Sequence, residues 1–303
     1  MNIPETGDLG EFLRTRRAAL TPADAGLTSY GRRRVPGLRR EELAQLAGIS
    51  IAYYTRLEQG QSTGASDSII EALARALRLR DDERAHLYDL ARPRPAARRR
   101  APRAEHATTA GRQLLAAMDG VPAVLVDPRN DVLAWNRLGH ALLAGHLPAD
   151  APARPADRPN LTRLLFLDRH TRELHRAWSE EAALAVASLR FVAAQQPDDR
   201  ALSDLIGELT VKSPEFAGLW AKHAVRLCTS GVKRLHHPEV GDLDLDFQVL
   251  HLPDTGGQRI VTHTAAPDSG SAYALALLAQ TLPAARKSSP RDVENARDVP
   301  TSL

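Results

Sequence analysis

Residues 38–60 read LRREELAQLAGISIAYYTRLEQG, and this stretch decides the fold of the first part of the chain. Two short helices are predicted in it, over residues 39–47 and from Ser50 to about residue 59. Gly48 follows the first helix, at the position where a helix commonly ends in the left-handed conformation. Ala44 is the small residue that two crossing helices need where they touch, and Ile49 is the aliphatic residue after the turn. The stretch therefore predicts a helix-turn-helix.

Three further helices are expected around this motif. Apolar residues recur at helical spacing over residues 9–20. Another helix is predicted to begin at Ser68, which has the spacing of a capping box with Glu71. A fifth helix is expected from residue 81 or 82 to about residue 91. Five short helices with brief connections predict an all-α domain over residues 8–91.

One side of the second helix of the motif is not needed for the core and can contact a partner. Helical spacing to Leu57 favours Tyr54 as a core residue. The N-terminal part of this helix contacts base edges in helix-turn-helix proteins, so its outward residues are candidates for a major groove. These residues are Ile51, Ala52, Tyr53 and Arg56.

The charge is divided unevenly along the chain. Residues 1–103 hold nineteen arginines against thirteen acidic residues, a formal charge of +6, and the remainder carries −3. A basic part joined to an acidic part is expected when only one domain meets a polyanion. Arg32, Arg33 and Arg34 lie in the loop before the motif. They are either a solvated charge run or contacts to phosphates or to a narrow A·T minor groove.

The middle of the chain separates two domains. Residues 92–106, RPRPAARRRAPRAEH, hold three prolines and six arginines and no large apolar residue, so they predict a solvated linker. The alternative is a segment that tracks along phosphates. Residues 107–283 predict an α+β domain with an antiparallel sheet, and residues 284–303 a disordered tail.

Several patterns support this second domain. Residues 122–135 read as a strand, an Asp-Pro-Arg-Asn turn and a second strand. Residues 243–252 alternate as a strand until the phase shifts at Leu250 and Leu252, which suggests a bulge. A long helix is expected over residues 170–196, a strand over 259–265 and a closing helix over 272–281.

The string GRRRVPGLRREELAQLAGISIAYYTRLEQG at residues 31–60 resembles the MmyB-like regulators, within the Cro/XRE class of helix-turn-helix domains. The resemblance implies that Ser50 caps the recognition helix and reaches a phosphate. It implies that Arg40, with Arg39 beside it, clamps the DNA backbone. By the same resemblance Ile51, Ala52 and Arg56 face bases, with Arg56 pairing to a guanine, and Tyr53 contacts phosphate or sugar. Glu58 matches a position that pairs with an arginine of the first helix, here Arg17, and the pair is structural.

Pieces of the second half resemble the MmyB-like ligand-binding domain, which has a PAS-like fold. They include VLAWNRLGHALL at residues 132–143 and SPEFAGLWAKHAV at residues 213–225. The resemblance implies a small, largely apolar ligand, such as a fatty acid, held between sheet and helices. The aromatic residues expected to border that cavity, each of which could equally be plain core, are Phe166, Trp178, Phe191, Trp220 and Phe247.

Other function classes find little support in the residues. The histidines lack metal-ligand spacing, Cys228 lacks a catalytic His/Asn constellation, and no phosphate loop or nucleophile elbow is present. We therefore expect no metal, no cofactor and no catalytic residue. The N-terminus lacks a signal-peptide pattern and no apolar run is long enough for a membrane, so a cytoplasmic protein is expected.

The pattern therefore predicts a DNA-binding regulator that binds a double-stranded operator as a homodimer and responds to a small apolar ligand. Two alternatives remain. In one, the second domain docks a protein partner and holds no ligand. In the other, it is an enzyme tethered to DNA.

Overall fold

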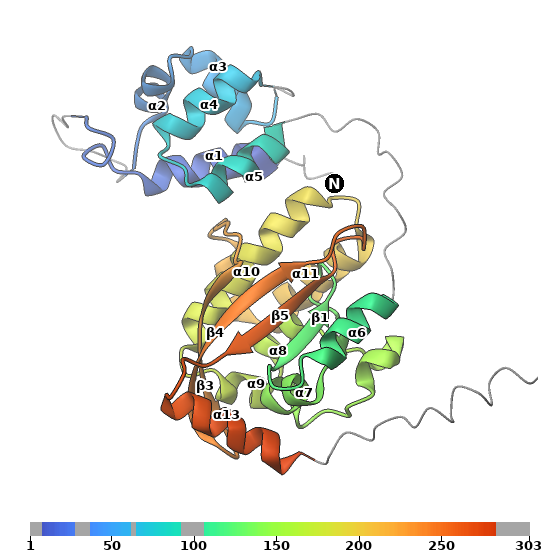
Figure 1. The fold of residues 1–303 in the computed structure, drawn as a ribbon. Coiled ribbons are helices and arrows are strands. Elements are labelled where there is room, and N and C mark those ends of the chain that lie inside the picture. Colours follow the sequence, from blue (N-terminus) through green and yellow to red (C-terminus); the bar gives the residue numbers. More distant parts are fainter. Residues whose placement is uncertain (1–7, 28–36, 62–64, 92–105, 283–303) are drawn as a thin grey trace, which may run out of the picture.

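The computed structural model describes residues 8–27, 37–61, 65–91 and 106–282. They form a small helical body and a larger body built around a sheet (Figure 1). Three sequence predictions lie outside the described residues: the run of Arg32, Arg33 and Arg34, the tail at 284–303, and the linker apart from its last residue.

The helical body contains five helices, as predicted. They are α1 (Asp8–Ala19), α2 (Arg40–Ala47), α3 (Ile51–Glu58), α4 (Asp67–Ala76) and α5 (Asp81–Ala91). Their apolar faces meet in one core, in which Leu13, Leu43, Tyr54, Leu57 and Leu73 are at most 1% exposed. Tyr54 therefore lies inside, as its spacing predicted. Burial of this shared face stabilises helices that are too short to persist alone.

The start of α4 differs from the prediction. Ser66 precedes the helix with an extended backbone, and its Oγ accepts a hydrogen bond from the N–H of Ile69. Ser68 lies within the first turn, so it is not the cap. Glu71 instead accepts hydrogen bonds from Arg84 and Tyr88 of α5. The predicted capping box is wrong because a second serine, two residues earlier in the chain, takes the cap position.

The larger body contains helices on both sides of a five-stranded sheet. Its helices are α6 (Thr109–Ala117), α7 (Arg137–Ala144), α8 (Leu161–Leu167), α9 (Arg169–Leu174), α10 (Trp178–Gln195), α11 (Arg200–Lys212), α12 (Pro214–Trp220) and α13 (Gly270–Thr281), with short 3-10 turns at Ala151–Ala153 and Pro155–Asp157. Its strands are β1 (Ala123–Val126), β2 (Val132–Trp135), β3 (Ser230–His237), β4 (Gly241–His251) and β5 (Arg259–Thr264).

The sheet has the order β2-β1-β5-β4-β3, and all neighbouring strands are antiparallel. On one face, Leu115 of α6 packs with Leu125 and Ile260. On the other face, Val124 packs with Leu161 of α8. The α+β fold with an antiparallel sheet agrees with the prediction.

The expected bulge does not occur in β4. The pairing of β4 with β5 runs without a shift from residue 246 to residue 251. Leu250 pairs with Ile260, which is buried in the cluster that α6 forms, and Leu252 packs against the same cluster. Where α6 covers one face of the sheet, apolar residues lie on both faces of the strand. The alternation of polar and apolar residues therefore ends without an extra residue in β4.

The long helix expected over residues 170–196 is two helices. The chain leaves the helical path between α9 and α10, where His175 forms a β-bridge to Leu235 and the N–H of Arg176 donates to the carbonyl of Arg234. Both partners belong to β3. Pairing with an edge strand therefore interrupts a segment whose local pattern is helical.

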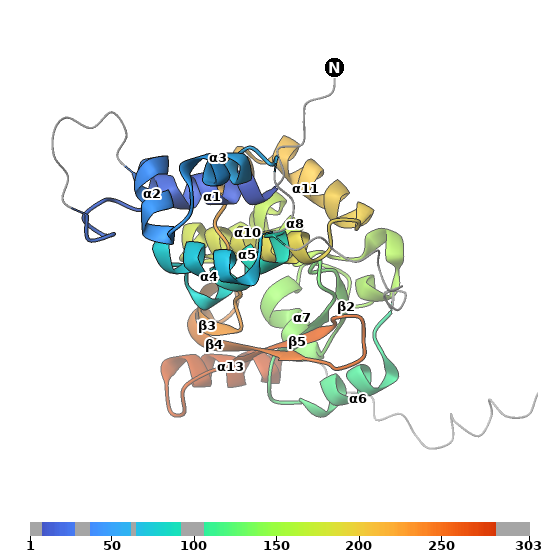
Figure 2. The ribbon, with the colours of Figure 1, turned by 90° about the horizontal axis from the view of Figure 1, so that it is seen from above.

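The two bodies pack against each other. Helix α5 of the helical body lies beside α10 of the larger body, as both views show (Figures 1 and 2). Phe191 of α10 and Val225, from the segment after α12, belong to the same apolar cluster as the core of the helical body. The larger body thus contributes side chains to the other body's core.

Candidate nucleic-acid interface and internal cavity

The turn between α2 and α3 is closed by Gly48, whose φ of 67° lies in the left-handed region. The N–H of Gly48 donates to the carbonyl of Gln45, and the N–H of Ile49 donates to that of Ala44. These bonds satisfy the last carbonyls of α2. Ser50 then begins α3, and its Oγ accepts a hydrogen bond of 3.2 Å from the N–H of Tyr53. The turn and the cap together fix the direction of α3.

Glu58, at the end of α3, joins three helices. Its side chain is 1% exposed and accepts hydrogen bonds from Arg17 Nε at 2.7 Å, Arg40 Nε at 2.6 Å and the Tyr54 hydroxyl at 2.7 Å. Gly10 allows α1 to approach this closely, because a Cβ there would lie 2.3 Å from the Glu58 carbonyl oxygen. The ion pair of Arg17 with Glu58 agrees with the structural role that the resemblance implied.

The charge of Glu58 is maintained by its partners. Burial alone would raise its pKa, but the hydrogen bonds from Arg17, Tyr54 and Arg40 outweigh burial and lower the pKa below its ordinary value. Arg40 is part of this buried network, although its side chain is 49% exposed. It therefore orients α2 against α3 and still reaches the surface.

The outward side of α3 carries a compact group of side chains. Ile51 is 52% exposed, Ala52 and Arg56 are exposed, and Tyr53 is partly buried. The Arg56 guanidinium lies 5.8 Å from the centre of the Tyr53 ring. Helix α3 lies on the side of the helical body that faces away from the larger body (Figure 1). This surface is therefore open to a large partner.

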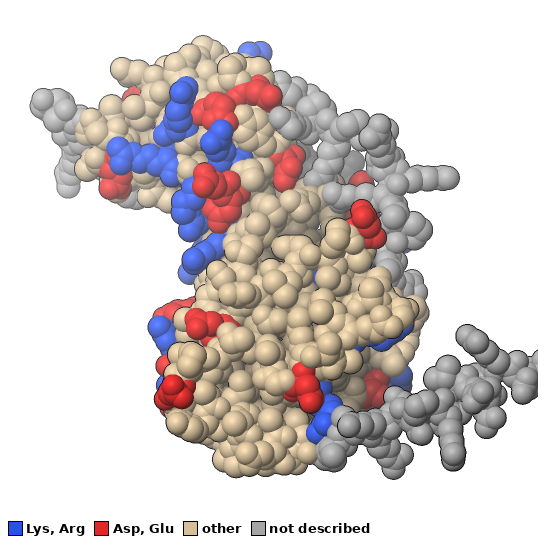
Figure 3. Space-filling model, in the orientation of Figure 1, with Lys and Arg blue, Asp and Glu red and all other residues tan. Residues whose placement is uncertain are grey.

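The described part of the helical body is not itself basic. On the face drawn in Figure 3, its arginine side chains are interleaved with Asp and Glu. Residues 8–91 without positions 28–36 and 62–64 hold ten arginines and twelve acidic residues, a formal charge of −2. The other nine arginines of residues 1–103 lie in the segments 32–34 and 92–103, outside the described residues. The basic excess of the first part of the chain comes from those two segments.

A cavity of about 150 Å³ lies between the sheet and the helices of the larger body. Most of its wall is apolar, and the residues that form this part include Val124, Leu161, Leu184, Phe247, Val249 and Val261. A cavity of about 150 Å³ lined by apolar side chains accepts a ligand of the size of benzene. The described cavity therefore admits a ring or a short alkyl chain without rearrangement of its walls.

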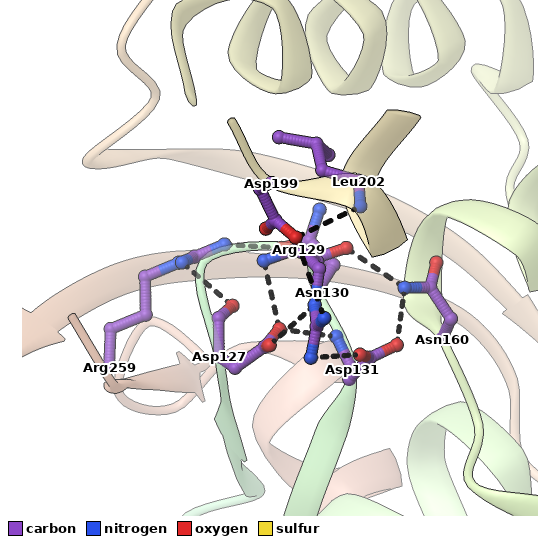
Figure 4. A network of polar contacts seen from close by, with 8 residues as sticks. All are labelled: Asp127, Arg129, Asn130, Asp131, Asn160, Asp199, Leu202 and Arg259. Carbon is purple, nitrogen blue, oxygen red and sulfur yellow. Dashed lines mark hydrogen bonds and ion pairs between the residues drawn. The ribbon is translucent and has the colours of Figure 1, made fainter. Parts of the chain in front are cut away.

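Arg259, the first residue of β5, lines one part of this cavity. Its guanidinium donates to the backbone carbonyl of Asp127 and to the side-chain oxygen of Asn130 (Figure 4). The Asp127 carboxylate is held by Arg129 at 2.9 Å. Burial lowers the pKa of Arg259 to about 10, which Asp127 opposes, so the guanidinium remains charged at neutral pH. Its two hydrogen-bond acceptors are neutral oxygens, and a positive charge faces the cavity.

Further polar groups line the cavity beside α10. Lys233 of β3 forms an ion pair with Glu181 of α10. Burial lowers the pKa of His175 to about 4 and that of His263 to about 3, so both imidazoles are neutral near pH 7. The Nδ1 atom of His263 is buried and has no hydrogen-bond partner among the described residues. Burial also raises the pKa of the Cys228 thiol. The cavity wall is thus mostly apolar, with polar groups at Arg259 and beside α10.

Two family models match the chain. One describes a helix-turn-helix domain and matches residues 8–87. The other describes the MmyB-like transcription regulator ligand-binding domain and matches residues 107–278, more than half of the chain. The chain belongs to the MmyB-like transcription regulators. The predicted family is confirmed, and comparison with curated proteins gave no match.

This MmyB-like regulator therefore joins a DNA-binding domain, formed by α1 to α5, to a ligand-binding domain, formed by α6 to α13. Both family models describe parts of transcription regulators, and neither describes an enzyme. Within the described residues, no group of three or more His, Cys, Asp and Glu side chains could hold a metal ion. Helices long and apolar enough to cross a membrane are likewise absent from the described part of the regulator.

The predicted DNA contacts lie together and the predicted cavity aromatics do not. The predicted DNA contacts whose positions the structure describes all lie in or next to α2 and α3. They are Arg39, Arg40, Ser50, Ile51, Ala52, Tyr53 and Arg56. Of the five aromatic residues, only Phe247 lines the cavity. In a separate core, the rings of Phe166 and Trp220 pack against Phe216, and Trp178 packs against Phe166. Phe191 lies at the contact between the domains. The expectation of one aromatic cavity is wrong because helices α8 to α12 form a core of their own.

The polar residues of the cavity were not predicted from the sequence. Arg259 is the first residue of an apolar strand. A single charged residue in a buried pattern was the sequence feature that could have indicated a polar group in the cavity. The sequence pattern offers the histidines and Cys228 only as metal or catalytic groups, and it does not indicate that His175 and Cys228 share a cavity. Lys233 and Glu181 lie on different elements, with nothing in the sequence to pair them. Only the folded sheet brings these residues to one cavity.

Proposed function

We propose that this regulator binds a specific DNA operator as a homodimer, and that a small apolar molecule with an acidic head group modulates that binding from within the cavity. The observation that carries the DNA part is the open side of α3, held rigidly by Glu58 and the Ser50 cap. Two copies would place their α3 helices in successive major grooves, about 34 Å apart on a pseudo-palindromic site.

The proposed contacts divide into base-reading and backbone contacts. Arg56 pairs with a guanine, and Ile51 and Ala52 press on thymine methyl groups. The contacts to the DNA backbone come from side chains at the starts of α2 and α3 and from the loop before α2. They are Arg39, Arg40, Ser50, Tyr53, Arg32, Arg33 and Arg34, of which the last three lie outside the described residues.

The DNA proposal is tested by selecting bound duplexes from a random pool and titrating the selected duplex with the full chain. Arg56→Ala should lower discrimination at one base position by about 1–3 kcal/mol, which is roughly 5- to 150-fold. Arg75→Ala, at an exposed position of α4, is the matched control and should change nothing. Equal discrimination by wild type and Arg56→Ala would remove the base-reading role of Arg56.

The ligand proposal rests on Arg259. A buried charge is stable when an opposite charge or strong hydrogen bonds compensate it, and an arginine fork matches a carboxylate. The guanidinium donates to two neutral oxygens in a cavity whose remaining wall is mostly apolar. A small amphipathic acid, such as a short fatty acid, supplies both a carboxylate for Arg259 and an alkyl chain for the apolar wall.

The ligand proposal predicts that hexanoate, whose short chain fits the cavity, binds the full chain, as measured by calorimetry. Arg259→Gln should weaken this binding at least tenfold, whereas Arg234→Gln, on an exposed part of β3, should not affect it. Native mass spectrometry of the protein as purified should also find a small acid bound. Equal affinity of wild type and Arg259→Gln for hexanoate would contradict the role of Arg259.

A second candidate function is the docking of a protein partner by an empty domain. One observation favours it: Tyr273 and Leu277, on one face of α13, are 68% and 52% exposed. This function predicts protein that is persistently empty in native mass spectra and that fails to bind hexanoate. It also predicts that Tyr273→Ser removes capture of the partner and leaves operator affinity unchanged.

A further inference from the structure

One side of helix α10 runs from the cavity to the DNA-binding domain. Glu181, Leu184, Ala185 and Ser188 line the cavity at helical spacing. Phe191, one turn further along, packs into the core cluster of the DNA-binding domain. The path from Glu181 to Phe191 spans about 15 Å at 1.5 Å per residue. Helix α10 therefore contacts both the cavity and the core of the other domain.

The segment 223–228, between α12 and β3, is a second connection. Val225 is 1% exposed in the core cluster of the DNA-binding domain, while Cys228 lines the cavity. The N–H of Arg226 donates to the carbonyl of Ala187 in α10. His223 holds a φ of 50°, a conformation that costs free energy and persists where its surroundings enforce it. The segment is thus bound on one side to the cavity wall and on the other to the DNA-binding domain.

Polar contacts hold the two domains at this segment. From α1, Arg16 donates to the carbonyl of His223 at 3.0 Å, and Glu11 lies 2.8 Å from the His223 imidazole. Asp82, at the start of α5, accepts a hydrogen bond of 3.3 Å from the N–H of Leu227. Arg16 also forms an ion pair of 2.8 Å with Glu83 of its own domain, which fixes its position. The contacts come from α1 and α5 together, so they define one orientation of the domain.

We propose that α10 and the segment 223–228 couple the cavity to operator affinity, by changing how the DNA-binding domain docks on the ligand-binding domain. The coupling rests on the proposed function of the cavity as the ligand site. A change in the cavity alters operator binding only if it stabilises one docking arrangement over another. The shared wall provides this difference, because the residues that line the cavity belong to the elements that hold the docked domain.

The coupling is tested by a double-mutant cycle that uses no ligand. Ala185→Phe fills the cavity from α10, and Arg16→Ala removes the hydrogen bond to the segment 223–228. Operator affinity of the full chain is measured for each single variant and for the pair. Arg84→Ala, which breaks an ion pair within the DNA-binding domain, replaces Arg16→Ala in the control cycle.

We expect Ala185→Phe to change operator affinity at least fivefold, the lower end of the range of about 5- to 150-fold that is typical of coupled sites. In the Arg16→Ala background the same change should fall below about twofold, whereas in the Arg84→Ala background it should persist. Ser188→Leu, which fills the same wall with less bulk, repeats the cycle if Ala185→Phe does not fold. Additive effects, or no effect of either filling variant on operator affinity, would overturn the coupling.

The outcomes separate the coupling from the proposed ligand. If hexanoate binds and the cycle is additive, the ligand site stands and the coupling is removed. If the cycle is non-additive and hexanoate does not bind, the coupling is supported and the proposed ligand class is removed. Hydrogen exchange in the segment 223–228 and in α5 gives a second readout, since Ala185→Phe should accelerate it in both.

Discussion

At the scale of single residues, the DNA-binding domain depends most on Glu58. Its buried carboxylate joins α3 to Arg17 of α1 and to Arg40 of α2. Glu58→Ala leaves the largely buried Arg17 guanidinium without its carboxylate and the Tyr54 hydroxyl without its acceptor, so we expect a loss of about 3–5 kcal/mol of stability. Exchange of α3 amides under native conditions measures this loss. Glu71→Ala, which breaks an ion pair at the surface, is the control and should have a small effect.

The neutral histidines of the cavity predict the pH dependence of the ligand-binding domain. His175 and His263 have pKa values of about 4 and about 3 in the folded chain, against about 6.5 when unfolded. As the pH falls, these histidines bind protons in the unfolded chain before they do so in the folded chain. Their contribution to stability is therefore complete above about pH 6.5 and is lost at lower pH. The loss approaches about 1.4 kcal/mol per histidine for each pH unit.

Tryptophan fluorescence isolates this effect, because all three tryptophans lie in the ligand-binding domain. The urea midpoint should fall between about pH 6.5 and about pH 5. His263→Leu should reduce the slope, whereas His236→Gln, at an exposed position, should keep it. A midpoint that does not change over this range would refute the account of the buried histidines.

At the scale of elements, the start of α4 gives a direct comparison of two serines. Ser66→Ala removes the cap and should cost about 1 kcal/mol, because the N–H of Ile69 loses its acceptor. Ser68→Ala, inside the first turn, should be nearly neutral. Thermal unfolding followed by circular dichroism ranks the two variants. The reverse order would mean that α4 begins at Ser68 after all.

The elements also show what local patterns can and cannot predict. The helix-turn-helix was predictable because Gly48, Ser50 and Tyr54 each satisfy a local requirement. The break before α10 and the change of phase in β4 were not, because they depend on β3 and α6, which are distant in sequence. A sequence pattern indicates which side of a helix or strand is buried. It does not indicate which other element covers that side.

At the scale of the whole molecule, the docking of the two domains was beyond sequence analysis. It joins Arg16 to His223, separated by 207 positions, through a backbone carbonyl that no residue type marks. The cavity was predictable only as an expectation from family resemblance. Its polar groups come from β3, β5, α10, the loop after β1 and the connection between α9 and α10, and no single stretch of sequence brings them together.

The charge distribution predicts which segments provide the salt dependence of DNA binding. The described residues of the DNA-binding domain carry a formal charge of −2, so the basic excess of the first part of the chain comes from the arginines at 32–34 and 92–103. Changing Arg32, Arg33 and Arg34 to Gln should lower the slope of log affinity against log salt by about 0.9 for each phosphate that they neutralise. Preference for the selected duplex should remain, because these side chains hold phosphates in the proposed interface. An unchanged slope would exclude all three from the interface.

The central claim is that the chain recognises one DNA sequence through α3. The most direct measurement is the affinity of the full chain for its selected duplex and for a scrambled duplex of the same composition, at near-physiological salt. A specific regulator should bind the selected duplex at least about a thousandfold more tightly, with two copies on each site. Equal affinity for both duplexes would contradict the claim.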